Sequence, residues 1–347
     1  MVRTVTRGAL LAAAALAATP SLAQYRQILS PTVTRSGITA ANNDLFGISV
    51  GNDVYHAAAR TGTPRDFGIF LNGTTPAVAD RASFLNDGLA VPSDRILPGV
   101  STDYSLATGI VIFEQQADRV VTVSLNGDAA ELVSNSAIDA FIGGTGPSIS
   151  DGGLLADGTV VFEEFDTDSL LGFDGTNVVS VISNTVLEAG QGGDDDIDSG
   201  VAGSSFNDLY WGNNATDAIM TFDGTSVSVA IPAATVAGLV GGPATYSGDF
   251  FAAPDGLIYL RAGSSGDNAV LSFDPADPNP AGTLTTVLSN ADLLAGPFGD
   301  DNISNFSWFG GELAFSAFSG GYYGFVPEPT TGVLVAMAGL FAAARRR

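Results

Sequence analysis

The chain has 347 residues, of which 37 are acidic, 13 are basic and none is cysteine. A formal net charge of -24 argues against a nucleic-acid-binding protein, because phosphate contacts need a cationic surface. Without cysteine there can be no disulfide, no thiolate metal site and no cysteine nucleophile. The length suits one large domain or two modest ones, and it is ample for a sizeable core.

Residues 1–23 have the layout of a secretory signal peptide. Arg3 and Arg7 precede a short apolar run, and small residues lead up to Ala23. Such a signal helix is removed when the protein is exported. We therefore expect signal peptidase to cleave between Ala23 and Gln24, and the fold to be formed by the residues that follow.

Residues 24–326 contain six similar units and no helix-length apolar periodicity. Each unit has a turn followed by a hydrophobic strand, then a second strand about ten residues later, and five of the six have a third strand. Several second strands close on Asn-Gly or Asp-Gly, which suit tight hairpin turns. The six copies of the first strand with its turn are Asn52–Tyr55, Thr108–Phe113, Asp157–Phe162, Asn207–Trp211, Asp255–Leu260 and Gly310–Phe315.

The two ends of this body complement each other. The sixth unit ends at Tyr322–Phe325 without room for a third strand, whereas Gln27–Ser30 is similar to the third strands of other units, such as Thr286–Ser289. A weaker run before each turn, such as Asp249–Ala252, supplies a fourth strand. Four-stranded units that repeat every 40–50 residues are typical of β-propellers. We predict an all-β fold, a six-bladed β-propeller over residues 24–326 closed by an N-terminal outer strand; a large sandwich and an open β-solenoid are the alternatives.

The C-terminus has three parts in order. Val326-Pro327-Glu328-Pro329 precedes the mostly apolar stretch Thr330–Ala344, and Arg345, Arg346 and Arg347 end the chain. The apolar stretch of 15 residues is short for a membrane-spanning helix, although flanking residues can extend it. The terminal arginines favour a cytoplasmic end. An ordinary tail anchor would have similar features.

This ending resembles the PEP-CTERM sorting signal of Gram-negative bacteria, over about the last 22 residues. The resemblance implies that an exosortase recognises residues 327–347, that a C-terminal transmembrane helix anchors the chain transiently, and that cleavage occurs near Pro327–Pro329. It further implies delivery to the cell surface or extracellular space, and it makes exopolysaccharide a candidate partner.

Acidic connectors between the units are the candidate metal sites. Carboxylate oxygens suit Ca²⁺, although the spacing here is not that of a known calcium-binding loop. On a body with 36 acidic and eight basic residues, a net charge of -28, such connectors also act as solvated loops. We otherwise expect no cofactor. The candidate Ca²⁺ ligands are Asp194, Asp195, Asp196, Asp198, Asp300 and Asp301.

Candidate catalytic residues are few, and we predict none. His56 is the single histidine and no Gly-x-Ser-x-Gly motif accompanies it, so we interpret it as a partly buried structural side chain. Glu114, Glu163 and Glu164 follow hydrophobic strands, and a carboxylate pair could cleave glycosides. Aromatic residues that recur at one position of the repeat predict packing between blades. These aromatic residues are Phe113, Phe162, Trp211, Tyr259 and Phe315.

These features favour an exported, exosortase-sorted protein of the cell surface or extracellular matrix that serves as a non-enzymatic binding or structural module. The alternative is an extracellular propeller hydrolase or lactonase with a calcium ion at its channel. A passive, highly charged surface-layer component is a third interpretation. Signal peptidase and exosortase are the expected processing partners, and no nucleic-acid partner is expected.

Overall fold

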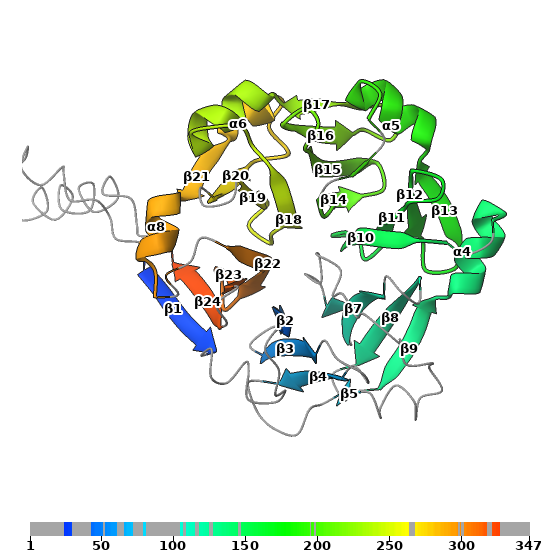
Figure 1. Ribbon diagram of the computed structural model, residues 1–347, viewed down its shortest axis with the longest axis horizontal. Coiled ribbons are helices and arrows are strands. Elements are labelled where there is room, and N and C mark those ends of the chain that lie inside the picture. The colour runs from blue at the N-terminus through cyan, green and yellow to red at the C-terminus, as the bar shows by residue number, and fades with distance from the viewer. Residues whose placement is uncertain are drawn as a thin grey trace, which may run out of the picture.

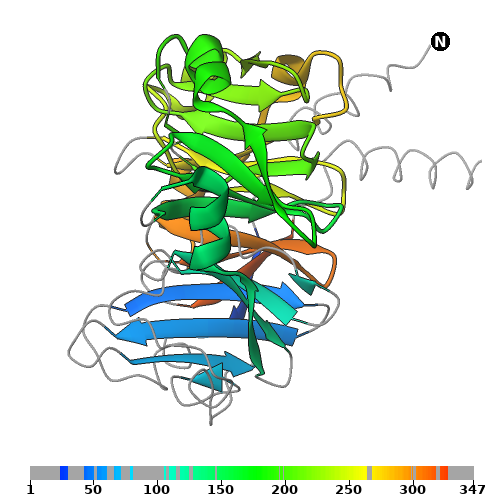
Figure 2. The ribbon, with the colours of Figure 1, turned by 90° about the vertical axis from the view of Figure 1, so that its right-hand side faces the viewer.

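The computed structural model shows antiparallel sheets arranged as a ring, with their inner strands around the centre (Figure 1). In the side view, the strands run roughly along the axis of this ring (Figure 2). Between residues 43 and 110 only the backbone of the strands is described. The described residues are 24–29, 43–50, 53–60, 66–71, 79–80, 105–106, 109–114, 118–124, 128–144, 147–194, 196–197, 199–263, 268–297, 299, 302–317 and 321–326.

The described strands form six four-stranded sheets, and in five of them four consecutive strands pair in chain order. The first two sheets consist of β2 (Asn43–Val50), β3 (Asp53–Arg60), β4 (Asp66–Leu71), β5 (Ala79–Asp80), β6 (Ser105–Leu106), β7 (Gly109–Glu114), β8 (Arg119–Ser124) and β9 (Ala129–Val133). The next three consist of β10 (Ile149–Leu154), β11 (Val160–Glu164), β12 (Ser169–Phe173), β13 (Val178–Ile182), β14 (Ala202–Ser205), β15 (Asp208–Asn213), β16 (Ala218–Phe222), β17 (Val227–Ile231), β18 (Tyr246–Ala252), β19 (Ile258–Ala262), β20 (Ala269–Phe273) and β21 (Thr285–Leu288).

The remaining sheet joins the two ends of the propeller body. Its order is β1-β24-β23-β22, so the N-terminal strand β1 (Gln24–Leu29) lies outside the last strand, β24 (Tyr322–Val326). β22 (Ile303–Phe309) is the inner strand, β23 (Glu312–Ala317) lies next to it, and β22 also contacts β2. The predicted pairing between the beginning and the end of the body is confirmed. The closing strand begins at Gln24, three residues earlier than predicted.

Short helices connect successive sheets, and the sequence analysis missed them. They are too short to show an apolar period, but sequence signals mark their ends: three follow Ser134, Ser183 or Ser289, and three end at a glycine with positive φ. Apart from α7, each described helix buries one apolar residue at the same place, such as Ile138 and Leu187. The described helices are α4 (Asn135–Ile142), α5 (Asn184–Gln191), α6 (Ala233–Val240), α7 (Pro280–Thr283), which lies in the Pro-rich insert, and α8 (Asn290–Ala295).

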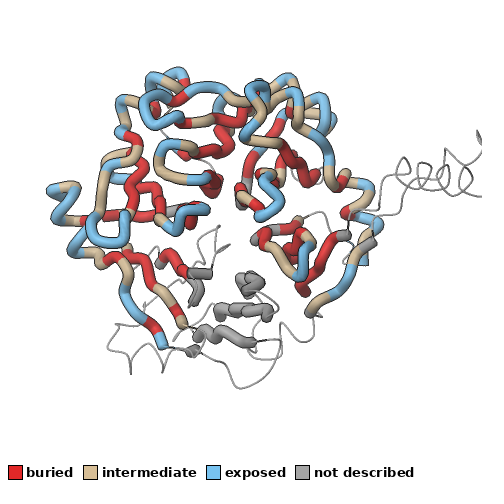
Figure 3. The backbone as a smooth tube through the Cα atoms, turned by 180° about the vertical axis from the view of Figure 1, so that it is seen from behind, coloured by how far each residue is buried: buried red, intermediate tan, exposed pale blue. Residues whose placement is uncertain are grey.

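The core lies between neighbouring sheets, where the buried residues gather (Figure 3). The five recurrent aromatic residues are all buried there, which confirms their predicted packing role. They do not share one structural position, however, and this part of the prediction was wrong. Phe162, Trp211 and Phe315 face the preceding sheet, whereas Phe113 and Tyr259 face the following one. An offset of one residue moves a strand side chain to the opposite face.

The predicted all-β propeller is therefore confirmed. Among the residues that the structure describes, no helix is long and apolar enough to cross a membrane. The predicted signal helix (residues 1–23) and C-terminal transmembrane helix (within residues 327–347) lie outside the described residues, so these two predictions stand as made.

Candidate functional site

Three inner strands, β10, β18 and β22, share an irregularity near the end where a connector enters the ring. Ser150–Asp151 of β10 stand opposite Glu163 alone, and Ser247–Asp249 of β18 stand opposite Arg261 alone. The register of β22 shifts similarly at Asn305–Phe306. Such β-bulges redirect side chains and are common beside functional sites. Because these are the inner strands (Figure 1), this end of the ring is the candidate site.

Glu163 and Arg261 each hold the connector that enters the next sheet. Glu163 is buried on β11, and its Oε1 accepts a hydrogen bond from the backbone N–H of Ile197 at 2.9 Å. Arg261 on β19 donates from Nη1 to the carbonyl oxygen of Ile303 at 2.7 Å and also to Oδ1 of Asn302. One side chain faces a backbone donor and the other faces a backbone acceptor, so opposite charges serve the same purpose.

The acidic connector after α5 is held by a buried amide. The Gln191 side chain is 3 % exposed, and its Nε2 donates to the carbonyl oxygens of Asp194 and Asp196, both at 3.1 Å. Its Oε1 accepts from Nε1 of Trp211 at 2.8 Å. The Asp194 carboxylate accepts a hydrogen bond from Nδ2 of Asn213. This network fixes the connector backbone against β15.

Glu164 stabilises the turn between β11 and β12. It is fully buried; its Oε2 accepts from the backbone N–H and hydroxyl of Thr167 at 2.9 and 2.6 Å, and its Oε1 accepts from the N–H of Ser148 at 3.1 Å. In the next sheet, Oδ1 of Asn213 accepts from the N–H and hydroxyl of Thr216 at 2.8 and 2.6 Å. The Glu164 carboxylate and the Asn213 amide therefore stabilise the same kind of turn. Because the amide is neutral, the turn needs an oxygen acceptor but not a negative charge.

The same turn recurs with an aspartate in the left-handed region. The φ angles of Asp118, Asp168 and Asp217 are 47°, 48° and 55°, a conformation that aspartate tolerates better than most residues. Oδ1 of Asp118 accepts from the N–H of Ile149 at 3.2 Å. Burial is the main cause that raises the pKa of Asp118, and this backbone hydrogen bond opposes it. These turns therefore contact the incoming chain of the next sheet.

Tyr246 locks the entry into β18. Its backbone N–H donates to Oδ1 of Asn214 at 2.6 Å, and its hydroxyl donates to the carbonyl oxygen of Asp217 at 3.0 Å. Burial, and then the nearby Asp217, raises the pKa of this hydroxyl, which keeps it a hydrogen-bond donor. A Cβ on Gly212 would lie 2.2 Å from Cγ of the Tyr246 ring, so only glycine fits at that position.

The predicted site residues thus have mixed outcomes. Glu163, Glu164 and Asp194 are engaged in hydrogen bonds within the ring, mostly to the backbone, so the structure does not bring them together as a free acid–base pair. In the described part of the chain, no group of three or more His, Asp or Glu side chains is placed to hold a metal ion. Asp195, Asp198, Asp300, Asp301 and the side chains of His56 and Glu114 lie outside the described residues, so the Ca²⁺ site stays a prediction.

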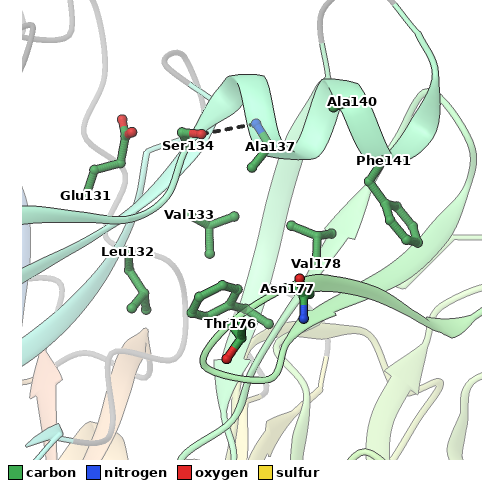
Figure 4. A pocket seen from close by; sticks show the side chains of 11 residues that line it. Glu131, Leu132, Val133, Ser134, Ala137, Ala140, Phe141, Thr176, Asn177 and Val178 are labelled. Atoms are coloured by element: carbon green, nitrogen blue, oxygen red, sulfur yellow. Dashed lines mark hydrogen bonds between the residues drawn. The ribbon is translucent and has the colours of Figure 1, made fainter.

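A separate hollow lies at the outer rim of the ring, between α4 and the turn from β12 to β13 (Figure 4). This groove has a volume of about 520 Å³, within the usual range for ligand sites. Its lining includes Leu132, Val178 and Phe141, whose side chain is 44 % exposed. Glu131 and Asn177 add polar groups to the lining. The sequence analysis did not predict this groove.

Sequence reasoning also missed Gln191, Asn213, Arg261 and Tyr246. A signal existed, because Thr167-Asp168 recurs as Thr216-Asp217 at a spacing of 49 residues. Polar residues that recur with the repeat belong to its architecture more often than to a catalytic site.

No family model and no curated protein matches the chain. Among solved structures, a protein of unknown function from Bacteroides thetaiotaomicron has a TM-score of 0.53 at 9 % identity, over 88 % of this chain and 76 % of the other. An inactive virginiamycin B lyase from Staphylococcus aureus has a TM-score of 0.47 at 11 % identity, over 83 % and 82 %. A gluconolactonase from Xanthomonas campestris has a TM-score of 0.46 at 14 % identity, over 90 % and 92 %. At these identities the likenesses concern the fold alone.

Proposed function

We propose that the chain is an exported propeller, sorted to the cell surface or extracellular matrix by its C-terminal segment, where it serves as a non-enzymatic binding or structural module. The observation that carries the non-enzymatic part is the use of Glu163 and Glu164. Both carboxylates are buried and accept hydrogen bonds from backbone N–H groups, so they are not available as a general acid and base.

The rim groove beside α4 supports the binding part of the proposal. It combines apolar side chains with a few polar groups, the usual composition of a ligand site. It lies on the outer edge of the ring, under the connector helix α4 and beside the turn from β12 to β13 (Figure 4). A ligand there would contact side chains of two neighbouring sheets.

The arrangement of the two ends supports the sorting part. The body begins with β1 at Gln24 and ends with β24 at Val326, directly beside the proposed signal peptide and sorting segment. Signal peptidase and exosortase would therefore act outside the paired strands. Exopolysaccharide at the cell surface remains the candidate partner in this proposal.

Deletion of residues 327–347 in the host tests the sorting proposal. The deletion keeps Val326, because Val326 pairs with Gln24 in the closing sheet. We expect the shortened protein to appear free in the medium, whereas the full chain fractionates with membrane and cell surface. A matched variant with Arg345, Arg346 and Arg347 replaced by Gln keeps the chain length and is expected to be sorted poorly. Unchanged retention of the shortened protein would contradict the proposal.

A further inference from the structure

The strand that leads into the C-terminal segment is not an edge strand. All five residues of β24, Tyr322–Val326, are in register with β1, and Tyr322–Phe325 are also in register with β23. The chain thus enters its last segment from the interior of a sheet. The outer neighbour that makes β24 interior comes from the opposite end of the chain.

Side chains of β1 fasten it to three elements. The Tyr25 hydroxyl donates to the carbonyl oxygen of Asp292 in α8 at 2.9 Å, and its ring contacts Phe315 and Phe325 with centroids 6.4 and 6.1 Å apart. Nε2 of Gln27 donates to the hydroxyl of Tyr323 at 3.2 Å. Tyr25 therefore contacts β23, β24 and a connector helix at once.

An ion pair adds a more exposed contact. Nη2 of Arg26 lies 3.0 Å from Oε2 of Glu312, and the Arg26 side chain is 50 % exposed. The Glu312 side chain is only 21 % exposed, and the Arg26 guanidinium lies 5.3 Å from the centroid of the Phe309 ring, so Arg26 adds a partly buried contact on the same strand.

Burial of β24 depends on this arrangement. Tyr322, Tyr323 and Phe325 are at most 5 % exposed, although β24 is the last strand of the propeller body. A protease needs an extended, unpaired segment, so it can cut β24 only after β24 leaves both neighbours. Loss of β1 would expose one whole edge of β24.

We infer that β1 acts as a clasp on β24. While the ring is closed, the C-terminal segment can be cleaved off only after Val326, because every residue of β24 is paired. The cellular meaning of this inference rests on the proposed sorting function. Removal of the segment then leaves the new C-terminus held without a covalent bond beside the mature N-terminus, since Gln24 is the register partner of Val326.

Limited proteolysis of the purified chain 24–347 tests the clasp without any host enzyme. Proteinase K is the probe, and mass spectrometry maps the C-terminal end of the resistant body. We expect this end at Val326 or beyond. In the Tyr25→Ala, Gln27→Ala double variant, we expect cleavage between Gly321 and Val326 to become at least tenfold faster.

Two further variants keep the test informative if the double variant does not fold. Tyr25→Phe removes only the hydrogen bond to Asp292 and should give an intermediate rate. Arg26→Gln removes the ion pair with Glu312 and the contact with Phe309 on the same strand, and it should speed cleavage less than the double variant does. Rapid cleavage within β24 of the unaltered chain would overturn the inference, and so would full protection of β24 in a folded double variant.

Analysis of the mature protein from its host distinguishes failure of this inference from failure of the proposed function. If sorting occurs, the mass of the mature protein should show a C-terminus at Val326 or later, and a terminus inside β24 would overturn the clasp. If the chain is never sorted, the proposed function fails while the proteolysis result stands by itself.

Discussion

At the rim of the ring, the contact of α4 with β13 differs from the contact of α5 with β17, although the two helices are alike. α4 and α5 both have eight residues, follow a serine and end at a glycine, and each packs near the first residue of the next outer strand, Val178 or Val227. Val227 is 7 % exposed beneath α5, whereas Val178 lines the open groove beneath α4. The groove is therefore a local departure from a repeated contact.

One residue position accounts for this difference. Seven residues after the serine, α4 carries Phe141 and α5 carries Gly190. A Cβ on Gly190 would lie 2.3 Å from Cβ of Val227, so glycine allows α5 to close onto β17. Phe141 cannot approach Val178 in this way, and its ring forms one wall of the groove (Figure 4). A repeat architecture can thus acquire a hollow through one large side chain without altering the sheets.

Gly190→Ala should give the largest effect of the variants that probe this comparison. The added methyl group overpacks the contact with Val227, and we expect the free energy of unfolding to fall by about 2 kcal/mol. Urea denaturation, read as a lower midpoint at an unchanged slope, measures this change.

Gly238→Ala on α6 is the matched control for that variant. A Cβ there meets no atom within 4 Å, so the higher helix propensity of alanine should raise the free energy of unfolding by up to about 1 kcal/mol. If both variants changed stability in the same direction, close packing at Gly190 would not be what distinguishes the two contacts.

Ser134→Ala and Ser183→Ala, at the N-termini of α4 and α5, should lower stability to different extents. Oγ of Ser134 accepts from the N–H of Ala137 at 3.0 Å, whereas Ser183 makes no side-chain cap. We expect Ser134→Ala to lower the free energy of unfolding by about 1 kcal/mol, and Ser183→Ala by only a few tenths. Thermal and urea unfolding of the two variants check this, and equal losses would mean that the cap does not hold α4 in its groove-forming position.

The sequence predicted the sheets better than the connectors. Repeated turn and strand patterns identified the strands and the complementary ends, because alternating burial and hairpin turns are local signals. The helices were missed because a single buried apolar residue per helix, such as Leu187, gives no periodicity. The faces of Phe113 and Tyr259 were assigned wrongly because a one-residue difference between repeats is invisible without the register of the strands.

The candidate site was less predictable for a different reason. Glu163 and Asp194 were visible as acidic residues, but their partners, the backbone N–H of Ile197 and the side-chain amide of Asn213, lie far away in the sequence. The groove depends on Phe141 where α5 has Gly190, and sequence alone does not show how closely a helix approaches the next strand. Long-range geometry decides whether such residues bind a ligand or hold the fold.

The smallest expected effect concerns the turns beneath the two helices, which should behave alike. Oδ1 of Asp174 accepts from the N–H groups of Asn177 and Thr176, both at 2.8 Å, and these hydrogen bonds lower the pKa of Asp174 below its usual 3.8. Asp223 makes the corresponding contacts with Ser226 and Thr225 in the next sheet, and its pKa is lowered in the same way.

A lowered pKa in the folded state means that each carboxylate stabilises the fold above its unfolded pKa and loses this contribution as the pH falls through the folded value. Asp174→Asn and Asp223→Asn should therefore lower stability slightly and equally at pH 7, and the difference from the unaltered chain should shrink as the pH falls below about 4. Urea midpoints between pH 7 and pH 3 measure this. If only Asp174→Asn lost stability in a pH-dependent way, the turn would contribute to the difference between the α4 and α5 contacts. An equal response of both variants would attribute that difference to Phe141 and Gly190.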